Sequence, residues 1–311
     1  MAIVWQISII QLTNRTLLRG VLLKDKPFTY DKHISRVNNL FKVVKSYLIS
    51  VYAYNEITII VDNQSIKTTT DKYGGFSVFL EDVHKEEVVV HIDSDNQSLK
   101  IIQTYPTVFP EMDSSFDVIS DIDDTIIHSY TADFFKRIST LAFTIPSKRI
   151  PLAFTQNLFD EFKNNDIRVF YISKSESNLF HMLTSFIDFH QLPKGPLFLT
   201  PYLKFSQLFK SKKHDFKIEN IRLILNNSGT KKFVLFGDDT QKDIEIYTHI
   251  INEFPERIIK VYIRQTKSKV SSRQTQMLSE LKLTGVSVHY FESDSDMNVI
   301  NELSKLKNSI K

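Results

Sequence analysis

Two aspartates stand two positions apart directly after an apolar stretch of the chain. Asp121 and Asp123 follow residues 116–120, and Thr125 comes two residues later. At the end of a buried strand, the first and third side chains can turn toward one point in front of the sheet, where ligands of open α/β sheets bind. Two crowded carboxylates repel each other. A divalent cation and a phosphate would relieve the repulsion, leaving one carboxylate to attack phosphorus while the other moves a proton. A polar turn in which an aspartate caps a following helix is the alternative.

Three further segments supply groups that phosphoryl transfer needs. Ser173 follows a short apolar run, and a hydroxyl at a strand exit can donate a hydrogen bond to a phosphate oxygen. Lys217 opens a helical pattern where the helix dipole disfavours a cation, which indicates a nearby negative charge unless the side chain points into solvent. Asp238 and Asp243 follow another apolar run and offer the hard oxygen atoms that Mg²⁺ accepts. A loop whose Asp243 caps the next helix is the alternative here.

These four segments, in this order, resemble the signature of the haloacid-dehalogenase-like phosphatases. The matching positions are Asp-x-Asp-x-Thr at 121–125, Ser at 173, Lys at 217 and Gly-Asp-x-x-x-x-Asp at 237–243. More detailed similarity, at 120–126, 192–197, 243–247 and 254–258, resembles the actin-patch-associated phosphatidate phosphatase family. The resemblance covers about residues 116–295 and, more loosely, the N-terminal region.

The resemblance implies a magnesium-dependent phosphatase that forms an aspartyl-phosphate. Asp121 is expected to attack phosphorus, and Asp123 to protonate the departing alcohol oxygen and then activate water. The expected ligands of Mg²⁺ are Asp121, Asp123, Asp238 and Asp243, and the expected substrate-binding residues are Ser173, Lys217 and Thr125.

Two positions depart from the family pattern. Asp239 stands where the family usually has Ser, which leaves open whether a further carboxylate joins the metal site. After Ser173, the run 174–178 replaces the usual Ser-Pro-Trp, so the substrate contacts of this segment are not transferred.

The family resemblance favours phosphatidate as the substrate, with diacylglycerol and phosphate as products. One local feature fits a lipid surface, because basic and aromatic side chains together attract anionic headgroups. These residues are Lys204, Lys210, Lys212, Lys213 and Lys217, interleaved with Tyr202, Phe205, Phe209 and Phe216. A solvated basic loop is the alternative. Two other functions remain open: a phosphatase acting on a soluble sugar phosphate, nucleotide or phosphoprotein, and a non-catalytic adaptor.

Composition agrees with a cytoplasmic enzyme, and the lipid substrate that the resemblance implies adds an expected contact with a membrane at its periphery. The chain has 311 residues, 42% apolar content and no Cys, so we expect sizeable cores and no disulfides. No apolar run reaches the roughly 18 residues of a membrane span, and the first residues lack the basic segment and cleavage site of a secretory signal. A net charge of +3 and the absence of a base-reading motif argue against nucleic acid. No protein partner is identifiable.

Two domains are expected, an accessory domain at 1–112 and a catalytic domain at 113–311. The first has short alternating runs at 57–61, 65–70, 76–80, 87–92 and 99–102, which predict a small β-sandwich. One helix interrupts it, with Ile34, Val37, Leu40, Phe41, Val44 and Leu48 on one side.

The second domain alternates strand and helix patterns, which predicts a doubly wound parallel sheet of the α/β class. Strands are expected near 117–121, 168–173, 197–200, 233–237, 259–263 and 287–291. Residues 126–150 are too few for a folded cap domain, so we expect an open site that can reach a phosphate protruding from a larger body.

Overall fold

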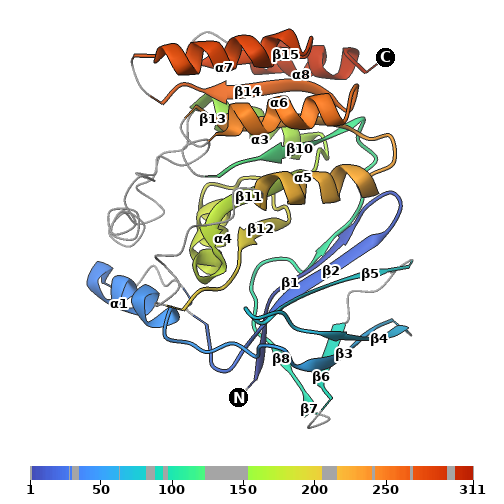
Figure 1. Cartoon of the computed structure of the whole chain (residues 1–311), viewed down its shortest axis with the longest axis vertical. Coiled ribbons are helices and arrows are strands. Elements are labelled where there is room, and N and C mark those ends of the chain that lie inside the picture. The colour runs from blue at the N-terminus through green and yellow to red at the C-terminus, as the bar shows by residue number, and fades with distance from the viewer. Residues whose placement is uncertain are drawn as a thin grey trace. The chain divides into compact units, whose positions relative to one another are not determined.

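The computed structural model describes residues 2–27, 29, 35–62, 64–81, 88–93, 97–122, 153–204, 216–239, 242–266, 269–292 and 298–310 (Figure 1). The expectations for Asp123, Thr125, residues 126–150 and the 205–215 part of the basic and aromatic segment therefore fall outside the described residues. Tyr202 and Lys217, at the two ends of that segment, are buried, so the expectation that they face a lipid surface is wrong. The chain forms two compact units. The first contains Met1–Glu111, Ser175–Ser185 and Leu199–Lys212, and the second contains Met112–Lys174, Phe186–Phe198 and Lys213–Lys311.

The first unit is built on two β-sheets. One has the strand order β5-β2-β1-β8, with β9 also pairing with β1; the other has the order β4-β3-β6-β7. The strands of the first sheet are β1 (Ile3–Gln11), β2 (Thr16–Leu23), β5 (Gly75–Leu80), β8 (Lys100–Ile101) and β9 (Val108–Phe109). Those of the second are β3 (Glu56–Val61), β4 (Gln64–Thr69), β6 (Val88–Ile92) and β7 (Gln97–Ser98). Each short alternating run expected from the sequence contains a strand.

The two sheets share one hydrophobic core. Ile9 and Leu18 of the first sheet and Ile59 and Val90 of the second are fully buried members of a single cluster. Alternate residues of β3 are buried, so one face of this strand meets the core and the other meets solvent. Burial of these aliphatic side chains is what holds the sheets together.

One helix, α1 (Arg36–Ser46), interrupts these strands as the spacing predicted. Ser35 caps its first turn by accepting a hydrogen bond from the backbone N–H of Asn38. The helix packs through Val43 and Tyr47, which are buried. Val37, Phe41, Val44 and Leu48, the described members of the apolar stripe read from the sequence, are all exposed.

The second unit contains a six-stranded sheet with the order β12-β11-β10-β13-β14-β15. The strands are β10 (Phe116–Ser120), β11 (Val169–Glu176), β12 (Leu197–Thr200), β13 (Lys232–Asp238), β14 (Ile258–Arg264) and β15 (Ser287–Phe291). β10 pairs in parallel with both β11 and β13, and β13, β14 and β15 continue in parallel. All six predicted strands are confirmed, and so is the α/β class.

Helices cover both faces of this sheet (Figure 1). The helices that lie wholly in the second unit are α3 (Ala153–Asn164), α5 (Phe216–Asn227), α6 (Asp243–Glu253), α7 (Ser272–Leu283) and α8 (Val299–Asn308). The short 3₁₀ turn η2 (Ser177–Leu179) and residues 180–185 of α4 (Phe180–Phe189) belong to the first unit. Phe236 of β13 packs against Phe159 of α3. A side chain on the next residue, Gly237, would meet Tyr247 of α6. Because successive strand residues point to opposite faces, α3 and α6 lie on opposite sides of β13.

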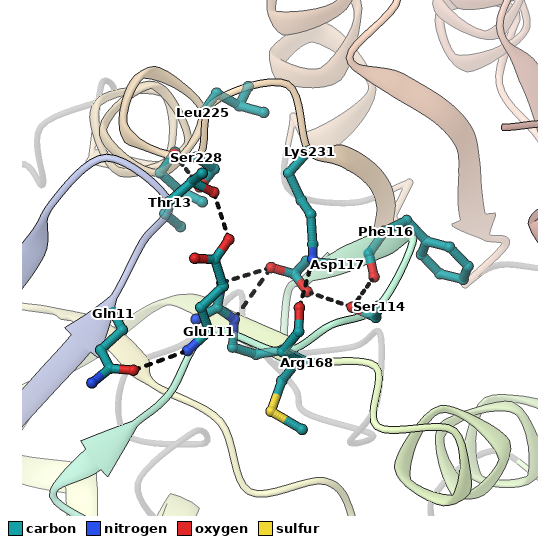
Figure 2. Close-up of polar contacts among 12 residues, drawn as sticks. Gln11, Thr13, Glu111, Ser114, Phe116, Asp117, Arg168, Leu225, Ser228 and Lys231 are labelled. Atoms are coloured by element: carbon teal, nitrogen blue, oxygen red, sulfur yellow. Dashed lines mark hydrogen bonds and ion pairs between the residues drawn. The ribbon is translucent and has the colours of Figure 1, made fainter. Parts of the chain in front are cut away.

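A buried ion pair fixes the beginning of β10 (Figure 2). Asp117 Oδ2 accepts hydrogen bonds from Arg168 Nη2 at 2.7 Å and Nε at 3.2 Å, and Ser114 Oγ donates to Asp117 Oδ1 at 3.3 Å. Burial raises the pKa of Asp117 above its ordinary value, and the positive charge of Arg168 opposes that rise. The charge of Asp117 is therefore paired inside the protein by Arg168, the residue before β11, and we assign this aspartate a structural role.

The expected end of β11 at Ser173 is wrong by three residues. The strand continues through Lys174 and Ser175 to Glu176. Thr200 Oγ1 of the neighbouring β12 donates a hydrogen bond to the carbonyl oxygen of Ser175 at 3.1 Å. Polar residues continue this strand because their groups find partners inside the protein.

Within the described residues, every helix is too short or too polar to cross a lipid bilayer.

Candidate active site

Three buried carboxylates converge at the carboxyl edge of the six-stranded sheet. Asp121, Asp238 and Asp243 each offer an oxygen atom, and these atoms all lie within 4.8 Å of one another. Each of the three side chains is almost completely buried. Like charges so close together in a low-dielectric setting repel strongly, and a bound cation removes that repulsion.

Neighbouring strand ends bring two of these acids together. β10 and β13 are paired up to Ser120 and Phe236, and the ladder extends one step further because the N–H of Asp121 donates to the carbonyl oxygen of Phe236 at 2.9 Å. Asp121 therefore leaves its strand beside the end of β13, where Asp238 is the last residue. The carboxyl ends of parallel strands form one edge, so the two segments deliver their acids to the same place.

The third acid is the first residue of α6. The preceding Lys242 adopts a left-handed conformation with φ of 66°, which turns the chain sharply into the helix. Asp243 then lies over Gly237, where an added Cβ would come within 2.8 Å of its Oδ2 atom. Glycine at 237 permits this close approach. The positive end of the helix dipole also stabilises a carboxylate at this position.

Lys217 inserts its ammonium group among these acids. Its Nζ atom lies 2.5 Å from Oδ1 of Asp243 and 3.0 Å from Oδ2 of Asp121, and the side chain is buried. Burial alone lowers the pKa of Lys217, but Asp121 and Asp243 outweigh it, so the pKa lies above its ordinary value. The expectation that Lys217 neutralises a local negative charge, rather than pointing into solvent, matches these contacts.

Two residues at this site were not singled out from the sequence. The pKa of Lys174 is lowered by burial and by the charge of Lys217, while the three carboxylates oppose the decrease. Lys174 therefore interacts electrostatically with Lys217 and with all three carboxylates. Tyr247, one turn into α6, donates a hydrogen bond to the carbonyl oxygen of Phe236 at 2.6 Å, and its pKa is raised by burial and by the same acids. The signal for Lys174 was its position directly after Ser173.

Asp239 turns away from the other carboxylates. Its Oδ1 accepts hydrogen bonds from the N–H and the hydroxyl of Thr266, at 3.1 and 2.5 Å, and its Oδ2 accepts one from Tyr290 Oη at 2.8 Å. Both oxygen atoms thus accept hydrogen bonds from other parts of the chain, namely the segment after β14 and strand β15. Among the described residues, Asp239 is not part of the carboxylate cluster, and its two oxygen atoms hydrogen-bond to the ends of neighbouring strands instead.

Ser173 is fully buried on β11. Two residues before it, Tyr171 pairs with Ser120 of β10, so Ser173 and Asp121 come from adjacent strands near the same edge. Asp123 and Thr125 lie outside the described residues.

The donor set of this cluster fits a hard divalent cation. Carboxylate oxygens are the protein ligands that Mg²⁺ and Ca²⁺ prefer, and neither His nor Cys contributes to the group formed by the described residues. A parallel α/β sheet with clustered acids and a lysine at its carboxyl edge can bind an anionic phosphate only with such neutralisation, because the acids alone would repel it.

These features combine clustered carboxylates with a lysine at the carboxyl edge of a parallel sheet, and comparison of the chain with known proteins finds a family that matches the same segment. Residues 116–265 match the family model described as "Phosphatidate phosphatase APP1, catalytic domain". The matched segment begins with β10 and ends just after β14, so it contains all four signature segments. Over this segment the chain matches the family, and the resemblance to the actin-patch-associated phosphatidate phosphatases is confirmed.

Two curated relatives extend the similarity beyond this segment. The chain is 30% identical over 234 residues to phosphatidate phosphatase APP1 of Saccharomyces cerevisiae, covering 71% of this chain and 38% of that protein. It is 25% identical over 255 residues to an uncharacterized protein of Schizosaccharomyces pombe, covering 81% of this chain and 40% of the relative. The chain thus spans about two fifths of the length of these relatives.

Among solved structures, a putative beta-phosphoglucomutase from Thermotoga maritima aligns with a TM-score of 0.38 and 14% sequence identity. The alignment covers 61% of this chain and 99% of that one.

Proposed function

We propose that this chain is a magnesium-dependent phosphatase that hydrolyses a phosphomonoester, with phosphatidate as substrate and diacylglycerol and phosphate as products. The observation that carries the proposal is the buried group of Asp121, Asp238 and Asp243 with Lys217 among them, inside the segment that matches the phosphatidate phosphatase catalytic domain.

Asp121 acts as the nucleophile in this proposal. One of its carboxylate oxygens forms a bond to phosphorus while the bond from phosphorus to the alcohol oxygen breaks, and Asp123 gives a proton to that oxygen. Asp123 then takes a proton from water, whose oxygen attacks the phosphorus of the aspartyl-phosphate. Phosphate leaves and the carboxylate of Asp121 is restored. Proton transfer of this kind contributes about 10²–10⁴ in rate.

The cation would be held by Asp121, Asp238 and Asp243, with Asp123 as a further ligand. When bound, Mg²⁺ supplies positive charge that stabilises the phosphoryl oxygens as negative charge develops on them. The chain's own positive groups act in the same direction. Lys217 is positioned by Asp121 and Asp243 to bind a phosphate oxygen, and Ser173 and Thr125 are proposed to donate hydrogen bonds to the others.

A substrate panel tests this function. Phosphate release is measured with phosphatidate in mixed vesicles, lysophosphatidate, a sugar phosphate and a nucleotide, each with Mg²⁺ and with EDTA in its place. We expect release from phosphatidate with Mg²⁺ and at least about a hundredfold less with EDTA, because the acids then repel the substrate. Release confined to water-soluble compounds would discard the lipid substrate but leave the chemistry. No release from any compound would discard the phosphatase.

Replacing Asp239 by Asn tests whether this residue only stabilises the neighbouring strand ends or also takes part in the carboxylate cluster. The carboxylate of Asp239 accepts three hydrogen bonds from Thr266 and Tyr290, and an amide cannot accept on both sides, so we expect a loss of about 1–3 kcal/mol in the free energy of unfolding. Phosphate release should stay within about threefold of the unsubstituted chain because the cluster is untouched. Urea unfolding and the release assay measure the two effects. A fall in release as large as that of a cluster carboxylate would show that Asp239 belongs to the site.

The N-terminal residues 1–112 are proposed to form an accessory domain of the β-sandwich type, and residues 113–311 the catalytic domain. The shared core of the two N-terminal sheets supports the first half of this proposal. The first compact unit also includes Ser175–Ser185 and Leu199–Lys212. We further propose that the chain is cytoplasmic and meets membranes at their surface, since its favoured substrate is a lipid.

A further inference from the structure

Helix α1 of the first unit presents an apolar stripe to solvent. Phe41 and Leu48 have exposed fractions of 69% and 70%, Val37 of 66% and Val44 of 39%. The intervals of four, three and four residues place these side chains in one row along the helix and the turn that follows it. Single exposed apolar residues are common on proteins, but a continuous row of four on one short helix indicates an interaction surface.

The orientation of this helix is set by its opposite side. Val43 and Tyr47 are buried, and the carbonyl oxygen of Ser46 accepts hydrogen bonds from Tyr202 Oη at 2.5 Å and from Asn178 Nδ2 at 3.4 Å. Tyr202 and Asn178 belong to the same unit as α1. Two separate parts of the sequence therefore hold the helix by its buried side, and the apolar row has to face outward.

The charged residues in the segment of sequence between Asp31 and Glu56, which contains the row, have one sign. Residues 32–55 contain no Asp or Glu, whereas they contain Lys32, Arg36, Lys42 and Lys45. Lys45 is exposed and Lys42 is half-buried on α1 itself. An apolar row flanked by lysines on an otherwise polar helix is the composition of helices that lie in the interface of a membrane with anionic lipids.

We propose that α1 docks this chain onto an anionic lipid surface. Phe41 and Leu48 enter the boundary between headgroups and acyl chains, with Val37 and Val44 beside them, while Lys42 and Lys45 contact the negative headgroups. This inference rests on the proposed function for one point only, namely that the substrate lies in such a surface. A protein partner or a second copy of the chain would need an acidic groove to match the same row, and the substrate class favours the lipid.

Vesicle flotation tests this surface without using the substrate. The 311-residue chain is mixed with phosphatidylcholine vesicles that contain or lack phosphatidylserine, and neither contains phosphatidate. We expect binding to the anionic vesicles that weakens as salt is raised. The variant F41S/L48S should bind at least about tenfold more weakly, because it removes the two largest apolar groups. The charge variant K42E/K45E should lose the preference for phosphatidylserine.

A matched control uses apolar side chains that are equally exposed elsewhere. Leu283 and Ile300, on α7 and α8 of the second unit, have exposed fractions of 84% and 67%. The variant L283S/I300S should float with vesicles as the unsubstituted chain does. Circular dichroism and thermal unfolding are expected to be unchanged in both double serine variants, because the side chains are on the surface in each case.

The outcomes separate this proposal from the proposed function. If α1 is the docking surface, F41S/L48S releases phosphate from a dispersed water-soluble ester at the unsubstituted rate but loses release from phosphatidate in vesicles. Equal binding of F41S/L48S and the unsubstituted chain would overturn the proposal, as would a lack of binding to anionic vesicles. If the unsubstituted chain does not bind vesicles and F41S/L48S self-associates less than it does, the proposal is overturned, and the row would instead be an interface with a second copy of the chain. An inactive chain that still floats through α1 would refute the phosphatase and keep the docking surface.

Discussion

Replacement of Asp121 by Asn is expected to reduce phosphate release by at least about 10⁴-fold, because an amide does not attack phosphorus. The variant should still fold. The amide introduced at this position would keep one oxygen atom near Lys217, whose nearer contact is with Asp243, and the change removes one of three mutually repelling charges. Steady-state phosphate release with saturating Mg²⁺ measures the loss, and near-ultraviolet circular dichroism verifies the fold.

Acid quenching of the reaction examines the intermediate directly. With radiolabelled phosphatidate, the unsubstituted chain should retain label on protein after quenching, and the Asp121→Asn chain should retain none. The Asp239→Asn chain is the matched control, because it changes a neighbouring buried carboxylate whose oxygen atoms face Thr266 and Tyr290. An Asp121→Asn chain that releases phosphate at the unsubstituted rate would refute the nucleophile and with it the proposed chemistry.

The acids at the sheet edge could be predicted because buried parallel strands leave a strong local signal. Phe116–Ser120 is completely buried, as is all of Lys232–Asp238 except its first residue, and strands covered on both faces read as nearly continuous apolar runs. Parallel strands end at one edge, so residues that directly follow such runs must meet there. The order of the segments along the chain was then enough to predict that Asp121, Asp238 and Asp243 lie together at this edge.

The roles of adjacent carboxylates could not be predicted in the same way. Asp238 and Asp239 are neighbours in sequence, and successive residues at a strand end point to opposite sides. Which of them joins the cluster depends on where α6 packs and on partners such as Tyr290, which is 51 residues away from Asp239. No local pattern contains that information.

Periodicity likewise predicted a helix at α1 but not the direction of its apolar row. A row at intervals of three and four residues indicates an amphipathic helix, and it is ordinarily assumed to face the core. Here Tyr202 and Asn178 hold the helix by the carbonyl oxygen of Ser46, and the face that contains Val43 and Tyr47 is buried instead. The contacts that decide this come from residues more than a hundred positions later.

Replacement of Lys217 by Met should destabilise the fold more than any other single change at the site that we consider. Its ammonium group contacts both Asp121 and Asp243, and removing one partner of a buried ion pair leaves charge without compensation, at a cost of about 3–5 kcal/mol. Because the pKa of Lys217 is raised, this stabilisation is fully present below the ordinary lysine pKa of about 10.4 and is lost only as the pH rises through the raised value. Urea unfolding at neutral pH in EDTA measures the loss.

A surface lysine provides the matched control for this substitution. Lys194 forms an ion pair with Asp188 at 2.8 Å, and both side chains are about half exposed, so Lys194→Met should change the free energy of unfolding by no more than about 1 kcal/mol. The double variant Lys217→Met/Asp243→Asn removes a cation and an anion together. Its destabilisation should be smaller than the sum of the two single changes by about 1–3 kcal/mol, because the carboxylate that Lys217 neutralised is also gone.

Magnesium offers an independent measure of the same electrostatic balance. If a cation is held by the cluster, Mg²⁺ should stabilise Lys217→Met more than it stabilises the unsubstituted chain, because the three carboxylates then lack their lysine and bind the ion more tightly. Phosphate release by this variant should remain low even so, since Mg²⁺ does not replace the ammonium group that binds a phosphate oxygen. Equal costs for Lys217→Met and Lys194→Met, with no effect of Mg²⁺ on either, would mean that the three acids are not charged together in the folded protein. The site would then lack the negative potential that draws a metal ion to it.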